Sequence, residues 1–377
     1  MTELQSMLDE VAKVAPGTRL RDAIDRIIRA QSGALIVIGG EPDVDRDSKG
    51  GFRLDVPFHP SLLYELAKMD GAILLDGSIT RIRMANVEIV PQLEAESSES
   101  GIRHRAAERL ARTRDALVVA ISERRGTVSL YRRQERFVLH DLGYILTKAQ
   151  GAVNSLSRYD RLFRGAVRRL SEAELSAGVM LQDVVEVLRR GLVASEIREE
   201  LHGYIVELGK DGHLMDLQLE EFPDVHREWR WLWQDYQAED GAPVVLKRAA
   251  ANLTDEDWYQ ALGYAKNDGE RLLIPRGYRV LHQIPRLPDS VIRQLVRRYK
   301  DVRTLAAATA ADLDDVAGVG PQRAGLIYRA LHSAESPLRD CDKRSFRSHG
   351  LRWSSRVVSD PPAKTKSSAV QSPQRSS

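Results

Sequence analysis

The sequence predicts a multidomain protein in which an α/β unit, a mixed sheet flanked by helices, is followed by an all-helical remainder. Its 377 residues exceed one ordinary domain, and a hydrophobic content of 42% is enough for several cores. Between Thr18 and about His140, helical patterns alternate with short β-rich runs. After Asp141 the strand signals stop, and apolar residues recur at spacings of three and four.

Six short apolar runs and three amphipathic patterns make up the N-terminal unit. The expected strands are 34–38, 72–75, 87–90, 117–121, 128–131 and 137–139. The expected helices are marked by Leu20, Ile24, Ile27 and Ile28, by Leu62, Leu63, Leu66 and Met69, and by the stretch 105–114. This content is typical of a sheet with helices packed on it.

Two long amphipathic patterns form the middle of the chain. They are marked by Leu156, Tyr159, Phe163, Val167 and Leu170, and by Leu181, Val184, Val185, Leu188 and Leu192. The run from Gly209 to His213 interrupts them, and an aromatic segment with Trp229, Trp231 and Trp233 follows. Stacking of these tryptophans on bases is one interpretation. Core or subunit packing is favoured, because they lie in a helical pattern with acidic neighbours such as Glu220, Glu221 and Asp235.

From Leu287 the pattern becomes helix, short turn, helix, and a tight turn at 316–324 enters the last helix. Its glycines, Gly318 and Gly320, would let the backbone approach a phosphate closely, and N–H groups at the helix start would bind it without reading bases. An ordinary turn between helices is the alternative. The candidate DNA-binding residues are Gly318, Val319, Gly320 and Arg323.

The net charge of only +2 does not indicate a nucleic-acid partner. Any nucleic-acid site must therefore be a local patch of positive charge. Beyond Pro337 the periodicity ends, and nine Lys and Arg residues against three Asp residues predict a disordered basic tail. It is either a solvated tail or an auxiliary contact to nucleic acid. The lone Cys341 and the lack of a targeting or membrane-spanning segment predict a soluble, cytoplasmic protein.

Two motifs about thirty residues apart carry the chemistry. In Ser100 to Arg109, a Ser-Gly turn brings Arg103, His104 and Arg105 to the first turn of an amphipathic helix, where free N–H groups attract an anion. Asp70 opens an apolar strand and offers a carboxylate to a metal ion or a hydroxyl. Alone, Asp-Gly is usually a turn and the basic residues a solvated face. Together they favour phosphoryl chemistry.

These motifs resemble the bacterial DNA integrity scanning protein family, whose members are diadenylate cyclases that join two ATP molecules into cyclic di-AMP. The matching segments are 33–39, 50–52, 68–72, 85–87, 100–109, 121–125, 275–279, 284–288 and 318–320. The resemblance runs from about Pro16 to Leu331. Two departures are Ile102 and Ala106, where the family usually has hydroxyl residues. Each lost hydrogen bond is worth about 0.5 to 1.5 kcal/mol, so weaker binding or slower turnover is expected.

The resemblance implies four regions: a diadenylate cyclase domain at 1–141, a helical spine at 142–284, a helix-hairpin-helix DNA-binding domain at 285–335, and a basic tail at 336–377. It also implies residue roles. Asp70 would position Mg²⁺ or Mn²⁺, Arg103, His104 and Arg105 would clamp the triphosphate as catalytic residues, and the backbone near Ile89 would hold adenine. The implied ATP-binding set is Gly71, Ala72, Ile89, Gly101, Ile102, Arg103, His104, Arg105, Ala106 and Ser122.

The implied reaction has two-fold geometry, because each 3′-hydroxyl attacks the other nucleotide's α-phosphate. Two copies of the N-terminal unit are therefore expected to face each other. The family resemblance extends this to a homo-octamer built on the spine, and to branched DNA as a partner that inhibits synthesis. One alternative is a DNA-binding oligomeric scaffold whose cyclase has weakened or been lost, and another is a different ATP-dependent nucleotidyltransferase on the same fold.

Overall fold

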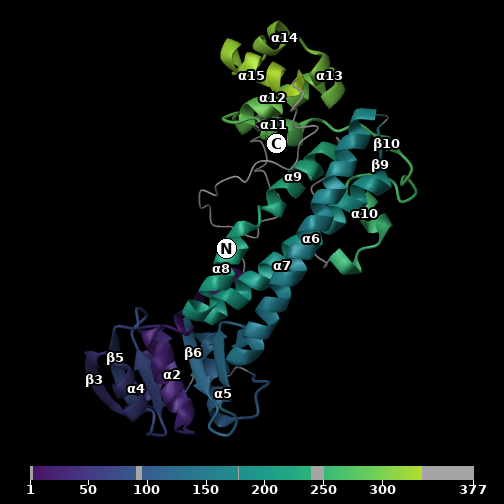
Figure 1. Cartoon of the computed structure of the whole chain (residues 1–377). Helices are drawn as coiled ribbons and strands as arrows, with labels where there is room; N and C mark the ends of the chain where they lie inside the picture. Colours follow the sequence, from purple (N-terminus) through teal and green to yellow (C-terminus); the bar gives the residue numbers. More distant parts are fainter. Residues whose placement is uncertain (1–2, 91–95, 177, 239–249, 333–377) are drawn as a thin grey trace, which may run out of the picture.

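The computed structural model describes residues 3–90, 96–176, 178–238 and 250–332, which form an N-terminal sheet unit, long paired helices and a small helical C-terminal unit (Figure 1). The tail expected at 336–377, with Cys341, lies outside the described residues. None of the helices in the described ranges combines the length and the apolar character needed to traverse a lipid bilayer.

The N-terminal sheet is mixed, as the sequence predicts. Its strands are β1 (Ala34–Gly39), β2 (Ser48–Lys49), β3 (Phe52–Pro57), β4 (Ala72–Leu75), β5 (Arg81–Ile89), β6 (Ala116–Ile121), β7 (Val128–Arg132) and β8 (Glu135–Val138). The order is β2-β5-β4-β1-β6-β7-β8, with β3 also paired to β5. Only β1 and β4 are parallel neighbours, and the other pairs are antiparallel.

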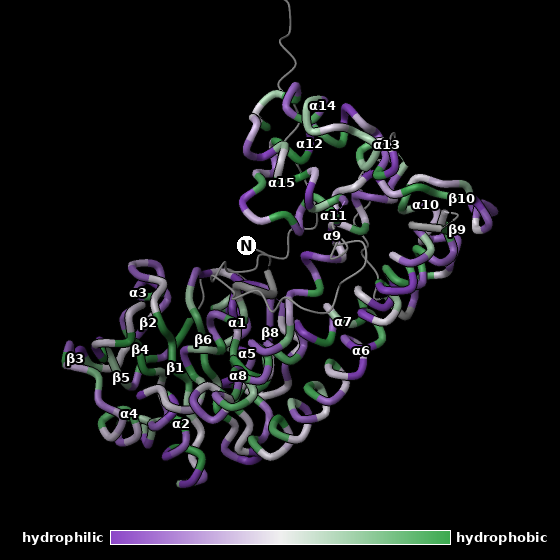
Figure 2. Tube along the Cα trace, turned by 45° about the horizontal axis from the view of Figure 1, so that its top comes forward, coloured by the Kyte–Doolittle hydropathy of each residue, from purple (hydrophilic) through white to green (hydrophobic). Residues whose placement is uncertain are grey.

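Helices cover both faces of this sheet. Alternate strand residues point to opposite faces, so Ile36 and Ile38 pack under α1 (Glu3–Lys13), α2 (Arg19–Arg29) and α4 (Pro60–Leu66). The intervening Val37 packs under α5 (Ile102–Thr113) and the short α3 (Asp43–Arg46). Strands β1, β4 and β6 are therefore buried on both sides, and they are coloured as hydrophobic along most of their length in Figure 2.

The structure corrects three details of the expected elements. Strand β5 begins at Arg81 rather than at Val87, and β2, β3 and α1 were not anticipated. The residues of β3 do alternate between apolar and polar, with Leu54 and Val56 packed against the core, so this strand signal was present in the sequence and was missed. Helix α4 ends at Leu66, and Met69 lies beyond it with its side chain exposed.

The spine is built on α6 (Leu142–Ser176) and α7 (Leu181–Leu208), which pack along each other. After the short η1 (Gly209–Gly212), α8 (His213–Glu221) and α9 (Val225–Tyr236) run back along them, and η2 (Ala250–Asn252) and α10 (Asp255–Ala261) follow. Two strands, β9 (Val179–Met180) and β10 (Leu272–Leu273), pair here, contrary to the expectation that strands end at Asp141. Each has only two residues, too few to show a periodic pattern.

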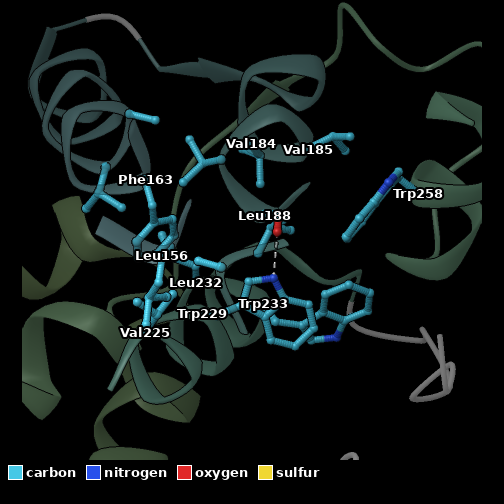
Figure 3. Packing of buried hydrophobic residues seen from close by; sticks show 14 of the residues in the cluster. Leu156, Phe163, Val184, Val185, Leu188, Val225, Trp229, Leu232, Trp233 and Trp258 are labelled. Carbon is cyan, nitrogen blue, oxygen red and sulfur yellow. Dashed lines mark hydrogen bonds between the residues drawn. The ribbon is translucent and has the colours of Figure 1, made fainter. Parts of the chain in front are cut away.

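The tryptophans of α9 support the packing interpretation. Trp229 and Trp233 are buried in the spine core, and Trp229 Nε1 donates to the Leu188 carbonyl oxygen at 2.8 Å (Figure 3). Trp231 is half-buried and stacks on His282. Their rings therefore hold helices together.

The C-terminal unit has its own core, formed by α11 (Tyr278–His282), α12 (Asp289–Tyr299), α13 (Val302–Ala307), α14 (Ala310–Asp314) and α15 (Gly320–His332). This core begins at Val280. Buried hydrogen bonds and an ion pair join this unit to the spine. The Asp235 carboxylate accepts the backbone N–H groups of Gly277, Tyr278 and Arg279 at 2.6–3.0 Å. The Arg279 guanidinium forms an ion pair with the buried Glu174.

Candidate active site

Four chain segments meet at one edge of the N-terminal sheet. The parallel strands β1 and β4 begin there, and their antiparallel neighbours β6 and β5 end there. Gly33 therefore precedes β1, Asp70 lies just before β4, Ile89 ends β5, and Ser122 follows β6. Strand order alone thus gathers residues from four separate motifs.

Arg103 joins the two motifs that the sequence singled out. Helix α5 begins at Ile102 with Gly101 as its N-cap, so Arg103 lies in its first turn. Its Nη2 is 2.6 Å from Asp70 Oδ1, and its Nη1 is 3.4 Å from Glu123 Oε2. The Asp70 side chain is 93% exposed, so this carboxylate is open to a ligand from solvent.

Two glycines make this arrangement possible. A Cβ added at Gly33 would lie 2.5 Å from Arg103 Nη1 and 3.2 Å from the Ile121 carbonyl oxygen, so a side chain there would displace the guanidinium. A Cβ at Gly71 would lie 2.4 Å from the carbonyl carbon of Asn86, so only glycine lets the chain enter β4 this close to β5.

The Ile89 peptide points toward the same edge. The Val90 N–H donates to the Asp47 carbonyl at 2.8 Å. Hydrogen-bonded and non-hydrogen-bonded pairs alternate along an antiparallel ladder, so the next pair of β2 and β5, Ser48 and Ile89, is not hydrogen-bonded. The Ile89 N–H and C=O therefore face the β4 side of β5. Strand β4 begins at Ala72, opposite Val87, two residues short of Ile89.

His104 differs from its two arginine neighbours. Its ring is half-buried and meets Tyr131 edge-on, with centroids 6.4 Å apart. Burial lowers the pKa of His104, and the charges of Arg136 and Arg103 lower it further against the opposing effect of Glu99. The lowered pKa favours the neutral imidazole, which offers a hydrogen bond instead of a fixed charge.

The segment before α5 is held by a buried carboxylate that sequence reasoning did not single out. Glu108 accepts from Ser97 Oγ at 2.5 Å and from the Ser98 N–H at 3.0 Å, and it pairs with Arg112 at 2.6 Å. Glu123 and Gly33 were also missed as site residues. Glu108 stands inside the Arg-rich motif, which was the one available signal, whereas the roles of Gly33 and Glu123 depend on contacts across the sheet.

The other expected site residues are distributed around the Asp70–Arg103 pair. Ile102 is 80% exposed and Arg105 is exposed, whereas Ala106 is half-buried against the sheet and Ala72 is buried in β4. The Ser122 hydroxyl accepts from the Arg125 N–H at 3.4 Å within the β6–β7 turn.

Exposed apolar side chains of the N-terminal unit gather near this pair. Phe52, Met69 and Ile102 are its exposed large hydrophobic residues within the described ranges. Met69 and Ile102 are chain neighbours of Asp70 and Arg103, and Phe52 lies opposite Ala85 beside the Asn86 bulge. Exposed apolar side chains next to a charged pair, as Met69 and Ile102 are, are typical of a surface that another molecule covers.

No cluster of three or more acidic, histidine or cysteine side chains that could hold a metal ion occurs in the described parts of the chain. Asp70 and Glu123 both offer exposed carboxylates to Arg103, and Asp70 is the more exposed of the two. Mg²⁺ is usually bound by one or two carboxylates together with the phosphates of its substrate, so this donor set fits a metal that arrives with a nucleotide.

The second expected site is the turn between α14 and α15. Gly318 and Gly320 both adopt positive φ, +84° and +64°, and Val319 between them is buried in the C-terminal core. A Cβ added at Gly320 would meet no atom within 4 Å, so open space lies beside this backbone. Arg323 Nη1 donates to the Gly318 carbonyl at 2.6 Å and stiffens the turn.

Comparisons with known proteins agree with the fold. A family model for the nucleotide-binding domain (DAC) of the DisA bacterial checkpoint controller matches residues 21–136, and the DisA linker-region model matches residues 139–268. The N-terminal unit is thus the nucleotide-binding domain of a diadenylate cyclase, a nucleotidyltransferase.

Relatives extend the match over most of the chain. The DNA integrity scanning protein DisA of Bacillus licheniformis is 39% identical over 87% of this chain and 94% of its own length, and that of Bacillus cereus strain G9842 is 39% identical over 89% and 96%. This chain belongs to the DNA integrity scanning protein family. A structure of a DacA double mutant from Staphylococcus aureus is 25% identical over 37% of this chain and 89% of its own, with a TM-score of 0.27.

Proposed function

We propose that this protein condenses two ATP molecules into cyclic di-AMP and two pyrophosphates, and that it binds DNA through its C-terminal unit. The carrying observation is the Asp70–Arg103 ion pair at an open sheet edge. A metal-binding carboxylate and a phosphate-binding guanidinium neutralise each other in the free protein. Both would exchange this partner for the metal and the triphosphate of ATP.

In this proposal Asp70 holds Mg²⁺ or Mn²⁺ together with phosphate oxygens, and the ion neutralises phosphate charge and favours ionisation of the 3′-hydroxyl. Arg103 and Arg105 bind the triphosphate and offset the charge that develops on pyrophosphate. His104 adds a hydrogen bond. The Ile89 peptide, which points past the end of β4, is placed to hydrogen-bond the adenine ring.

The reaction requires two copies. Each 3′-oxygen forms a bond to the α-phosphorus of the other ATP, the bond to pyrophosphate breaks, and the 3′-proton leaves to solvent. A single site holds one nucleotide, so two N-terminal units must face each other across an isologous interface. The exposed Phe52, Met69 and Ile102 would supply its apolar contacts. We propose that eight copies of the 42.3 kDa chain assemble into a homo-octamer. Light scattering would measure the mass of this assembly.

Product analysis tests the enzymatic proposal. Chromatography after incubation with ATP and Mg²⁺ or Mn²⁺ should yield cyclic di-AMP, and Asp70→Asn should abolish it while the melting temperature stays unchanged. Glu65→Gln, another exposed carboxylate in an ion pair with Lys68, is the matched control and should cyclise normally. Parental turnover in Asp70→Asn would show that Asp70 is structural. A wild-type protein that makes no product would favour a scaffold whose cyclase is lost.

The DNA proposal is tested at the 316–320 turn. Its open space suits close approach of a phosphate, with no base specificity and with preference for branched DNA when one oligomer displays several turns. Deletion of 285–377 is a poor test, because the C-terminal core begins at Val280. Gly320→Asn is better: asparagine tolerates positive φ, and its side chain would fill the space a phosphate needs. DNA affinity should fall without loss of cyclase activity.

A further inference from the structure

The outward face of α9 is cationic, although α9 belongs to the spine. At 100° per residue, Arg227, Arg230 and Trp231 fall within an arc of about 100° on the side opposite the buried Trp229. Arg227 and Arg230 are both exposed. Burial of Trp229 and its neighbours in the spine core thus fixes which way these arginines point.

This face continues into the C-terminal unit across α11. The Trp231 ring stacks on His282 of α11 at a centroid distance of 4.7 Å and an interplanar angle of 9°. His282 Nδ1 in turn lies 3.8 Å from Asp289 Oδ1 at the start of α12. Both views place α11 between α9 and the remaining helices of the C-terminal unit (Figures 1 and 2).

Two further exposed arginines, Arg293 and Arg297, lie one turn apart on α12. The charges of α9 and α12 arginines act on the same histidine, which indicates that these side chains lie near one another. Burial lowers the pKa of His282, Asp289 opposes this, and the charges of Arg230, Arg227 and Arg293 lower it further. The charges of three arginines from two different units therefore act on one imidazole, which Trp231 stacks against.

Arg297 extends the same surface. Burial raises the pKa of the Tyr278 phenol, and the charges of Arg276, Arg297 and Arg293 oppose that rise. Tyr278 begins α11 and His282 ends it, so the charges of the α12 arginines act on both ends of this helix.

These four arginines, Arg227, Arg230, Arg293 and Arg297, are not paired with acids in the described part of the chain, a property that they share with other exposed arginines such as Arg158 and Arg169. By contrast, Arg21, Arg190 and Arg271 each pair with an acid on their own helix or turn. Two carboxylates lie near the four arginines: Asp289 beside His282, and Asp224, which accepts the backbone N–H of Arg227 at 3.3 Å. Like charges held this close repel one another until an anion binds.

The arginines of α12 and the turn proposed to bind DNA lie on different sides of this helix. A Cβ at Gly318 would lie 3.4 Å from Val291 Cγ2, and Arg293 stands about 200° around α12 from the buried Val291. Stacking on His282 occupies one face of the Trp231 ring, which leaves guanidinium groups rather than an open aromatic platform as the main recognition elements. Arginines spread over two helices suit a repeating polyanion better than one small anion.

We infer that Arg227 and Arg230 of α9, with Arg293 and Arg297 of α12, bind the phosphate backbone of duplex DNA. The inference rests on the proposed DNA binding and extends it, because it assigns half of the surface to the spine. DNA would then bridge the joint between the spine and the C-terminal unit.

The test is a salt titration of DNA binding by the full chain with a junction DNA. Arg227→Gln combined with Arg230→Gln removes two phosphate contacts, and each contact contributes about 0.9 to the slope of log K against log salt. The slope should fall by about 1.8, so the loss of affinity between roughly 50 and 200 mM salt becomes about tenfold smaller.

The matched control is Arg158→Gln with Arg169→Gln. These exposed arginines lie on the side of α6 opposite Asp160, whose partner Arg164 faces α9, so the same charge is removed from another face of the spine. A slope unchanged by the α9 pair, or reduced equally by the α6 pair, overturns the inference. If Gly320→Asn still weakens binding, the proposed DNA function survives that failure. A wild-type protein that binds no DNA overturns both, and binding of the α9 arginines to phosphatidylglycerol vesicles in place of DNA reassigns this face.

Discussion

Replacement of Gly33 by alanine should disable the cyclase without unfolding it. The added Cβ would lie 2.5 Å from Arg103 Nη1, about 1 Å inside an ordinary contact, and 3.2 Å from the Ile121 carbonyl oxygen. The guanidinium is the end of a flexible side chain and the carbonyl belongs to a strand, so Arg103 moves first. Its bridge to Asp70 and Glu123 would then break.

The two consequences differ in size. Asp70 is almost fully exposed, so loss of its ion pair should cost stability only about 0 to 1 kcal/mol. Displacement of a phosphate-binding group by about 1 Å can cost on the order of 100-fold in turnover. We expect a turnover of cyclic di-AMP about 100-fold lower and a nearly unchanged melting temperature.

The control is Gly151→Ala in α6, where a new Cβ would meet no atom within 4 Å and alanine favours the helix. Turnover should be measured from initial rates of cyclic di-AMP formation at saturating ATP, beside thermal melts of each variant. Parental turnover in Gly33→Ala would refute the claim that the space beside Gly33 positions the Arg103 guanidinium.

Three further outcomes follow from the structure. Ile102→Thr and Ala106→Thr should each tighten ATP binding or raise turnover by up to about tenfold, measured as KM and kcat; unchanged values would show that the site compensates in another way. Arg279→Met should destabilise the protein by about 3 to 5 kcal/mol in urea unfolding, because it leaves Glu174 buried and unpaired; a loss below about 1 kcal/mol would contradict this. Burial raises the pKa of Asp235 to about 7, so the stability that this carboxyl contributes is full below about pH 4 and is lost as pH rises through 7. Asp235→Asn should remove this part of the pH dependence of unfolding. Identical curves of stability against pH for the two proteins would exclude this role of Asp235.

Much of the N-terminal unit could be predicted because its central strands can be recognised from their own residues. Strands β1, β4 and β6 are buried on both faces, so each is a continuous apolar run bounded by polar residues. Strand β3 is not such a continuous run: its residues alternate between apolar and polar, most of them are exposed, and its place in the sheet depends on pairing with β5. The same limit applies to the two-residue strands β9 and β10, which exist only because their segments meet.

The sequence by itself determined the ingredients of the site: an acid before a buried strand, an Arg-rich helix start, and a glycine turn near the C-terminus. These signals are local, written in residue type and spacing over a few turns of chain. The family resemblance added the reaction and the metal. Neither could show that Arg103 reaches Asp70, 33 residues away, since that contact needs β4, β1 and β6 in this order with α5 packed across them.

Only the tertiary structure decided the roles of residues that carry no local signal. Gly33 matters because a guanidinium from α5 occupies the space beside it, and Glu123 matters because the turn after β6 ends at the same sheet edge. The cationic face joins Arg227 to Arg293, residues from separate helices that meet through the stack of Trp231 on His282. Such groupings depend on which surfaces burial brings together, and burial is a property of the whole fold.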